Sequence, residues 1–539
     1  MYLNYMQGKK QFAEKLFMQF QLSDRVPVDN FYRRLREAVD LRWLYSATKK
    51  YYGSEGQQSI DPVVFFKLLL IGYLENLNSD RKIIDHSKMR LDILFFLGYD
   101  LDEELPWHST ISRTRQLYGE EVFKELFSKV LGMCISKRML SGKRQAIDSA
   151  YIKANASMDS LVEKEIIEDG EQYINDLQHD EYGNNIQQHE NVMKDDRDND
   201  HISKSRKKST ESHHSWKNKE YKGMPGGTTL SRQSDADDSD KGRPKFVSNH
   251  THFSTTDRDA RVSVKPGKPR QLNYTMQTAV DMDSHVITNV EAHLADRRDS
   301  ESLPQVLSNT INNLQEHGLD VDEIAADTGY SSGKALQACQ DHHVTAYIPN
   351  FGQYKSERPG FLYNKEDDYY QCERGIRLPY KKTYQDKKGY FKQYRSSAKD
   401  CGHCPLRATC IGGRADYKKI EDTTDKHLYD QMHKRLQTRY AQVMKKRRQA
   451  TVEPVLGTLI NFMGIRRIWT RGLKGANKFM IAAAIAYNLK KWLNYKEQKL
   501  TTAVMAIKKT GKGLRIHFFD LLASLYCIKS DLAKIPVRF

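Results

Sequence analysis

The sequence predicts an α/β protein in which a mixed sheet is flanked by helices and preceded by a helical segment. Three observations predict this class. Residues 143–153 are partly apolar and rich in β-compatible residues, which indicates a strand. The stretches 271–281 and 285–292 have extended character and are separated by a short polar turn, as in a β-hairpin. Helical and extended patterns then alternate over 302–348, the order typical of an α/β layer.

The segment before the sheet, residues 1–140, has apolar residues at helical intervals. Asp61 and Pro62 precede a strongly apolar stretch and suit an N-cap and a first helical position. A later helical pattern carries Arg113 and Arg115. Short helices with exposed arginines are typical of a helix-turn-helix DNA reader. A plain helical bundle with a solvated basic face has the same pattern, so both interpretations stay open.

The remaining core elements follow one another with short connections. Gly318 suits the C-terminal stop of the helix after the hairpin, and a glycine-containing turn follows the next strand. Besides the hairpin we expect, in order, a strand at 261–264, a helix at 302–317, a strand at 323–327, a helix at 334–342 and a strand at 344–348.

Changes in composition predict the domain boundaries. One long stretch is dense in charged residues and poor in large apolar ones, so it cannot bury enough apolar surface to offset its ordering entropy. We expect a helical domain with the candidate DNA-binding helices (1–140), the first parts of the core (141–157 and 246–350), a polar insertion or linker (158–245), a Cys-containing β insertion (351–424), the helical end of the core (425–495) and a basic C-terminal tail (496–539).

The charge of the chain is strongly positive. Lys and Arg number 86 against 69 Asp and Glu, a formal net charge of +17, which favours a polyanionic partner. Membrane surfaces and ribosomes also attract such a charge, so the charge alone does not choose among them. No stretch has the roughly 20 apolar residues of a spanning helix, and seven cysteines do not form a disulfide framework. We therefore expect a soluble cytoplasmic protein with no membrane partner.

Three acidic residues stand at positions suited to holding divalent ions. Asp148 lies on the first predicted strand, Asp327 ends a later strand, and Glu453 follows a basic run in a helical region. In phosphodiester chemistry two divalent ions about 4 Å apart activate the attacking oxygen and neutralise developing charge. Most acidic residues are simply solvated, and four others lie near the same sheet and compete with this set: Asp281, Asp283, Asp296 and Asp299.

Several motifs resemble bacterial insertion-sequence transposases of the DDE class. The main ones are AIDSAYIKANAS at 146–157, ADTGYSS at 326–332 and VEPVLG at 452–457. The resemblance is closest to the group numbered 1182, which is related to insertion-sequence groups four and five. Further similar stretches lie, in order, at 59–63 through 97–99, 254–261, 274–281, 471–473 and 486–490.

The resemblance implies a ribonuclease-H-like catalytic core in which Asp148, Asp327 and Glu453 bind Mg²⁺ or Mn²⁺. It implies an enzyme that binds terminal inverted repeats, cuts DNA there and joins the freed 3′ ends to target DNA. It further implies a homo-oligomer on DNA and a bacterial, nucleoid-associated location. Two alternatives stay open: a nuclease of the same fold without strand transfer, and a non-catalytic DNA-binding relic.

The basic residues around the last acid differ from the pattern of related transposases. Those enzymes often carry Tyr and Arg before the Glu and a Lys after it, where this chain has Lys446, Gln449 and Ile460. Other basic residues can take over as phosphate contacts, although a solvated basic face is the alternative for each. The candidates are Arg447, Arg448, Arg466, Arg467, Arg471 and Lys474.

Four cysteines form a candidate structural Zn²⁺ site. Cys401, Cys404 and Cys410 are closely spaced, and Cys372 precedes them. The Cys-x-x-Cys pair is a common zinc knuckle, and His403 can replace one of the thiolates. Four ordinary reduced thiols are the alternative interpretation.

Overall fold

The computed structural model describes residues 20–53, 59–164, 248–264, 269–352, 354, 356–386, 389–411 and 415–495. Most of the predicted polar insertion and the predicted basic tail lie outside these residues. The chain divides into two compact units, Met1–Leu493 and Asn494–Phe539, and the description below concerns the first. Within the described ranges, none of the helices has both the length and the apolar character needed to cross a bilayer.

The N-terminal part is helical, as predicted. The apolar stretch after Asp61 forms a helix that is buried on nearly all sides. The carboxylate of Asp61 accepts hydrogen bonds from the N–H groups of Val63 and Val64, which confirms the predicted N-cap. The helices are α1 (Leu22–Arg25), α2 (Phe31–Ala38), α3 (Trp43–Thr48), α4 (Pro62–Leu74), α5 (Asp80–Lys88), α6 (Leu91–Leu97), α7 (His108–Leu117) and α8 (Glu120–Ser136).

A mixed sheet forms the centre of the α/β part, which confirms the predicted class. Strand β1 (Arg144–Lys153) pairs antiparallel with β5 (Gln271–Asp281) on one side and parallel with β7 (Glu323–Ala325) on the other. Strand β8 (Thr345–Tyr347) continues the sheet in parallel beyond β7. The outer edge of β5 is shared by two antiparallel partners, β6 (Ile287–Leu294) and β4 (Arg261–Ser263).

The predicted hairpin is confirmed, with one difference in its second strand. Strand β6 begins at Ile287, two residues later than predicted, because His285 has a positive φ of 59° and belongs to the turn. Asp281 closes that turn: its Oδ1 accepts hydrogen bonds from the N–H groups of Asp283 and Ser284. The turn is thus fixed by a side chain as well as by the strand ladder.

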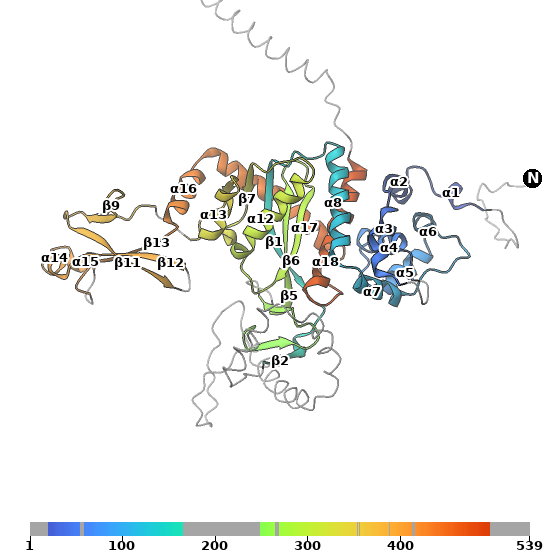
Figure 1. The fold of residues 1–539 in the computed structure, drawn as a ribbon, viewed down its shortest axis with the longest axis horizontal. Coiled ribbons are helices and arrows are strands. Elements are labelled where there is room, and N and C mark those ends of the chain that lie inside the picture. Colours follow the sequence, from blue (N-terminus) through green and yellow to red (C-terminus); the bar gives the residue numbers. More distant parts are fainter. Residues whose placement is uncertain are drawn as a thin grey trace, which may run out of the picture. The chain divides into compact units, whose positions relative to one another are not determined.

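Helices α12 (Asp299–Gln315), α13 (Gly333–Asp341) and α16 (Lys426–Leu436) pack with the sheet into one apolar core (Figure 1). Helix α12 begins three residues before the predicted start, at Asp299, and Gly318 with φ of 73° follows its C-terminal end as expected. The early start places an acidic residue in the first turn of this helix.

Two long helices complete the core. Helix α17 (Arg439–Phe462) packs against β1 and β5. Helix α18 (Leu473–Asn494) follows β6: its Asn477 accepts a hydrogen bond from the N–H of Ala292, and its Asn488 bonds both backbone groups of Ile287. These amides satisfy backbone groups on an edge strand that would otherwise remain open to pairing.

The Cys-containing segment folds around an antiparallel sheet. Its small core consists of Tyr370, Leu378, Tyr394 and Ile420. Two short helices accompany the predicted strands, and a separate two-stranded sheet lies at the ends of the predicted polar insertion. The elements are β9 (Phe361–Asn364), β10 (Tyr369–Cys372), β11 (Arg377–Asp386), β12 (Gly389–Arg395), α14 (Ala398–Gly402), α15 (Arg407–Cys410) and β13 (Lys419–Thr423), with β2 (Leu161–Glu163) and β3 (His252–Ser254) apart.

Candidate active site

Asp148 lies in the middle of the central strand β1, opposite Thr278 of β5. Its Oδ2 accepts a hydrogen bond of 2.7 Å from Nη1 of Arg448, which helix α17 supplies. Its Oδ1 accepts a bond of 2.8 Å from the N–H of Ser149. The carboxylate is therefore held on a rigid element and paired with a buried guanidinium.

Asp327 lies beside Asp148. Strands β1 and β7 are parallel, with Ala146 opposite Ala325. Strand β7 ends at Ala325, two residues before the predicted end, so Asp327 lies just beyond the strand and caps the 3-10 turn Thr328–Tyr330. The Asp327 Oδ1 accepts a hydrogen bond of 2.9 Å from the N–H of Gly329, which fixes the turn after β7.

The electrostatics of the pair agree with this proximity. The pKa of Asp148 is raised, first by burial, and the negative charge of Asp327 raises it further. The N–H of Ser149 and the Arg448 guanidinium act in the opposite direction without overcoming the burial. Two neighbouring half-buried carboxylates repel each other, and the Arg448 guanidinium compensates part of this negative charge.

Glu453 is not brought to this pair. It lies on α17 five residues after Arg448 and is exposed. At 100° per residue it projects roughly 140° around the helix from Arg448, away from the sheet. In the described part of the chain, no three or more His, Cys, Asp or Glu side chains are grouped closely enough to hold a metal ion. The role of Glu453 remains a prediction.

A buried hydrogen-bond chain next to the pair was missed by the sequence analysis. The hydroxyl of Tyr330 donates to Oε1 of Gln277, and Nε2 of Gln277 donates to Oδ1 of Asp299 at 2.7 Å. Tyr330 and Gln277 are fully buried. Their positions in the sequence could have identified them: Tyr330 lies three residues after Asp327, and Gln277 is in one of the family-like stretches.

The donor set fits a hard divalent cation. Asp148 and Asp327 offer carboxylate oxygens, the ligands that Mg²⁺ and Mn²⁺ prefer, and Mg²⁺ keeps several waters and needs few protein ligands. The backbone also leaves room: a Cβ at Gly329 would lie 3.1 Å from Asp327 Oδ1 and 3.4 Å from Asp299 Oδ2. The lack of a side chain at Gly329 thus keeps open the space between two carboxylates.

Some of the predicted DNA-contacting residues are engaged in ion pairs with acidic residues, and the others are exposed. Arg115 is buried and forms a bidentate ion pair with Asp80, with bonds of 2.6 and 3.0 Å, so it supports the fold and is not available to contact DNA. Arg448 is engaged by Asp148, and Arg447 forms an ion pair with Asp283. The exposed candidates are Arg113, Arg466, Arg467, Arg471 and Lys474.

Two of the exposed arginines lie at the end of the strand that carries Asp148. The backbone of Lys153 bonds to the carbonyl of Arg466 (3.3 Å) and to the N–H of Ile468 (2.8 Å), so this segment extends the sheet. Lys153 is five residues beyond Asp148, or roughly 17 Å along an extended strand. Arg466 and Arg467 are therefore exposed basic residues beside the end of the strand that carries Asp148.

The four predicted zinc ligands are free thiols in the structure. Cys401 is buried, with its Sγ 3.0 Å from Oγ of Ser396, and Cys372 packs against the aromatic core of the small sheet. No three of these cysteines form a metal-holding group among the described residues. A zinc site stays a prediction.

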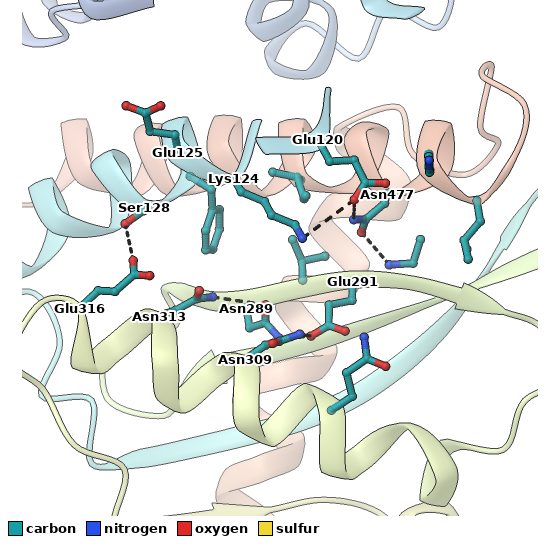
Figure 2. A pocket seen from close by; sticks show the side chains of 17 residues that line it. Glu120, Lys124, Glu125, Ser128, Asn289, Glu291, Asn309, Asn313, Glu316 and Asn477 are labelled. Carbon is teal, nitrogen blue, oxygen red and sulfur yellow. Dashed lines mark hydrogen bonds and ion pairs between the residues drawn. The ribbon is translucent and has the colours of Figure 1, made fainter. Parts of the chain in front are cut away.

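A pocket of about 580 Å³ lies elsewhere, between α8, β6, α12 and α18 (Figure 2). Its polar side chains largely satisfy one another: Asn309 donates to Glu291 at 2.8 Å, and Asn477 donates to Glu120 at 3.1 Å. The lining does not include Asp148 or Asp327. The carboxylate pair rather than this pocket is the candidate for chemistry.

Two family models match the chain. Residues 20–117 match a transposase domain, which gives the class of protein, a transposase. Residues 371–493 match a transposase DDE domain, so the chain is a DDE transposase of the insertion-sequence kind, an enzyme that acts on DNA. The second match includes Arg448 and Glu453, whereas Asp148 and Asp327 precede it. No curated protein matches the chain.

Proposed function

We propose that this transposase cuts DNA at the ends of its element and joins the freed 3′ ends to target DNA, using Asp148 and Asp327 as ligands for Mg²⁺ or Mn²⁺ and Glu453 as the third acid. The observation that carries the proposal is the proximity of Asp148, on β1, to Asp327, just beyond the end of the adjacent parallel strand β7, whose charge raises the pKa of Asp148. The group numbered 1182, terminal inverted repeats as substrate and a homo-oligomer on DNA belong to the proposal and rest on the resemblance.

The topology supports a ribonuclease-H-like core. The strands lie in the order β6, β5, β1, β7, β8, in which β5 is antiparallel to both β6 and β1, and β7 and β8 are parallel to β1. Ribonuclease-H-like sheets have this order, with acids on the first strand and at the end of the fourth. Asp148 and Asp327 occupy those two places.

Different residues of the chain would bind the metal ions, neutralise Asp148 and bind the DNA phosphates. Asp148 and Asp327 would hold the divalent ions, which when bound stabilise developing charge and make the attacking oxygen more reactive. Arg448 neutralises Asp148 from the side of α17. Arg466 and Arg467 would bind backbone phosphates of the DNA and thereby set its register on the sheet.

Glu453 and Arg448 lie on the same helix but on different faces. Because about 140° of helix rotation separates the two side chains, a turn of α17 that brought Glu453 toward the pair would withdraw Arg448 from Asp148. We therefore propose that Arg448 pairs with Asp148 before the site is assembled on DNA and that Glu453 replaces it afterwards.

Cleavage of a labelled duplex that carries the element's own end, with Mg²⁺ or Mn²⁺, tests the function. Asp327→Ala is expected to abolish cut and joined products by more than about 100-fold, above the loss typical of a residue that only supports a ligand. DNA binding should persist, and Asp341→Ala at an exposed position is the matched control.

The other outcomes identify the alternatives. Cut products without joined products from the wild type indicate a nuclease that lacks strand transfer. DNA binding without any cutting indicates a relic. Equal cutting by the wild type and Asp327→Ala removes Asp327 from the site.

A further inference from the structure

Asp299 is a third carboxylate at the spot beside Gly329. It lies in the first turn of α12, partly buried, and its Oδ1 is held by Gln277. Its Oδ2 and the Asp327 Oδ1 lie 3.4 and 3.1 Å from one and the same point, the position that a Cβ of residue 329 would take. The two carboxylates therefore face each other across a gap that only glycine leaves open.

The side chains that hold Asp299 are tied to the Asp327 turn. Gln277 bridges Asp299 and the hydroxyl of Tyr330, and both bridging residues are fully buried in the sheet face covered by α12. The pKa of Tyr330 is raised, first by burial and then by the charges of Asp299, Asp148 and Asp327. The start of α12 and the end of β7 are thus locked together through hydrogen bonds.

The negative charges of Asp299 and Asp327 are not balanced by ion pairs with described residues. Arg448 pairs with Asp148, but no basic side chain in the described ranges forms an ion pair with Asp299 or Asp327. Oδ2 of Asp299 likewise has no hydrogen bond from any described residue. A rigidly held carboxylate with one open oxygen next to a metal ligand is suited to accept hydrogen bonds from the waters that a hydrated cation keeps.

We propose that Asp299 is a positioning residue for the divalent ion: the buried chain Tyr330–Gln277–Asp299 holds its carboxylate beside Asp327, where its open oxygen orients the hydration shell of the ion. The inference rests on the proposed function, because it takes Asp327 as a metal ligand. It extends the site to α12, an element that the sequence analysis did not connect with the chemistry.

A purely structural role makes a different prediction. An acidic residue in the first turn of a helix also stabilises it through the helix dipole. Glu301 lies in the same first turn and is exposed, so Glu301→Gln removes the same dipole interaction without touching the gap at Gly329. It is the matched control for Asp299→Asn.

The test is Mn²⁺ binding to the full chain without DNA, measured by electron paramagnetic resonance and by calorimetry. Asp299→Asn, which can still accept the bond from Gln277, is expected to weaken Mn²⁺ binding about 10- to 100-fold, the range for residues that orient ligands. Tyr330→Phe should weaken it less, and Glu301→Gln should leave it unchanged. Thermal unfolding of each variant establishes that it is folded.

Wild-type Mn²⁺ affinity in Asp299→Asn overturns the proposal, as does an equal loss in Glu301→Gln. If Asp299→Asn fails to fold, Tyr330→Phe takes its place in the test: unchanged Mn²⁺ affinity in that variant overturns the positioning role of the Tyr330–Gln277–Asp299 chain.

Asp327→Ala distinguishes failure of this positioning role from failure of the proposed metal ligands. If it also binds Mn²⁺ like the wild type, the proposed function fails in its metal assignment; if it loses binding while Asp299→Asn does not, only the positioning role fails.

Discussion

At the scale of single residues, arginines with the same sequence signature have different roles. Arg113 and Arg115 lie two positions apart on α7, yet Arg113 is exposed whereas Arg115 is buried against Asp80. The backbone carbonyl of Arg115 also accepts a bond of 2.8 Å from Lys478 of α18. Arg115 thus joins the N-terminal helices to the core, and only Arg113 remains available to phosphate.

Substitution of these two arginines should separate stability from DNA binding. Arg115→Met leaves Asp80 without its partner in a largely buried place and should lower the free energy of unfolding by about 3 kcal/mol. Arg113→Ala should leave stability unchanged and weaken DNA binding. Urea denaturation and a DNA-binding titration measure the two effects. Equal destabilisation by both substitutions would contradict the assignment.

At the scale of elements, two of the family-like stretches, 254–261 and 471–473, are joined by hydrogen bonds in the structure. Asp257 accepts a hydrogen bond of 3.1 Å from the N–H of Gly472, and Asp259 accepts one of 2.7 Å from the N–H of Leu473. These N–H groups lie at the N-terminal end of α18, where helical donors have no partner within the helix. Gly472 has a φ of 75°, which favours glycine there. The loop before β4 therefore caps the helix that covers β6.

The contact of β6 with α12 gives a pH-dependent prediction. Burial alone would raise the pKa of Glu291, but hydrogen bonds from His293, Asn289 and Asn309 outweigh it, and the pKa lies below the ordinary 4.5. A carboxyl with a lowered pKa in the folded state stabilises the fold above 4.5, and this contribution is lost as the pH falls through the lowered value.

Glu291→Gln should therefore reduce the free energy of unfolding at pH 7 by about 1–3 kcal/mol, the range for hydrogen bonds to a charged group. The difference from the wild type should shrink as the pH drops below 4.5. Denaturant unfolding at a series of pH values measures it, with the exposed Glu301→Gln as control. A difference that does not vary with pH would show that the charge of Glu291 contributes nothing.

At the scale of the whole molecule, the net charge of +17 and the exposed Arg466 and Arg467 both favour binding to a polyanion. Counterion release makes the affinity for DNA fall linearly with the logarithm of the salt concentration, and each phosphate contact contributes about 0.9 to the slope. Arg466 and Arg467 are exposed, and their segment bonds to the backbone of Lys153 at the end of the strand of Asp148.

The double substitution of Arg466 and Arg467 by Ala should reduce the salt slope by about 2, one for each lost phosphate contact. Equilibrium binding to a duplex at several salt concentrations measures the slope. Lys399→Ala, at an exposed position on α14 of the Cys-containing segment, is the control. An unchanged slope in the double variant would remove these arginines from the DNA path.

The local patterns predicted most of the elements because they depend on short stretches of chain. The cap at Asp61, the hairpin after Gln271 and the stop at Gly318 each follow from residues close in sequence. The candidate pair Asp148 and Asp327 followed from strand patterns and motifs. The engaged states of Arg115 and Arg448 could not be predicted, since their partners lie 35 and 300 residues away.

The sequence by itself determined the α/β class, the order of the elements, the excess of positive charge and the candidate acids Asp148 and Asp327. Only the tertiary structure decided that Asp327 lies beyond the end of the strand parallel to that of Asp148, that Arg448 rather than Glu453 meets Asp148, and that Asp299 faces Asp327 across Gly329. The physical reason is that strand propensity and helix periodicity are local, whereas register between strands and the rotation of a helix against a sheet depend on contacts between residues far apart in the chain.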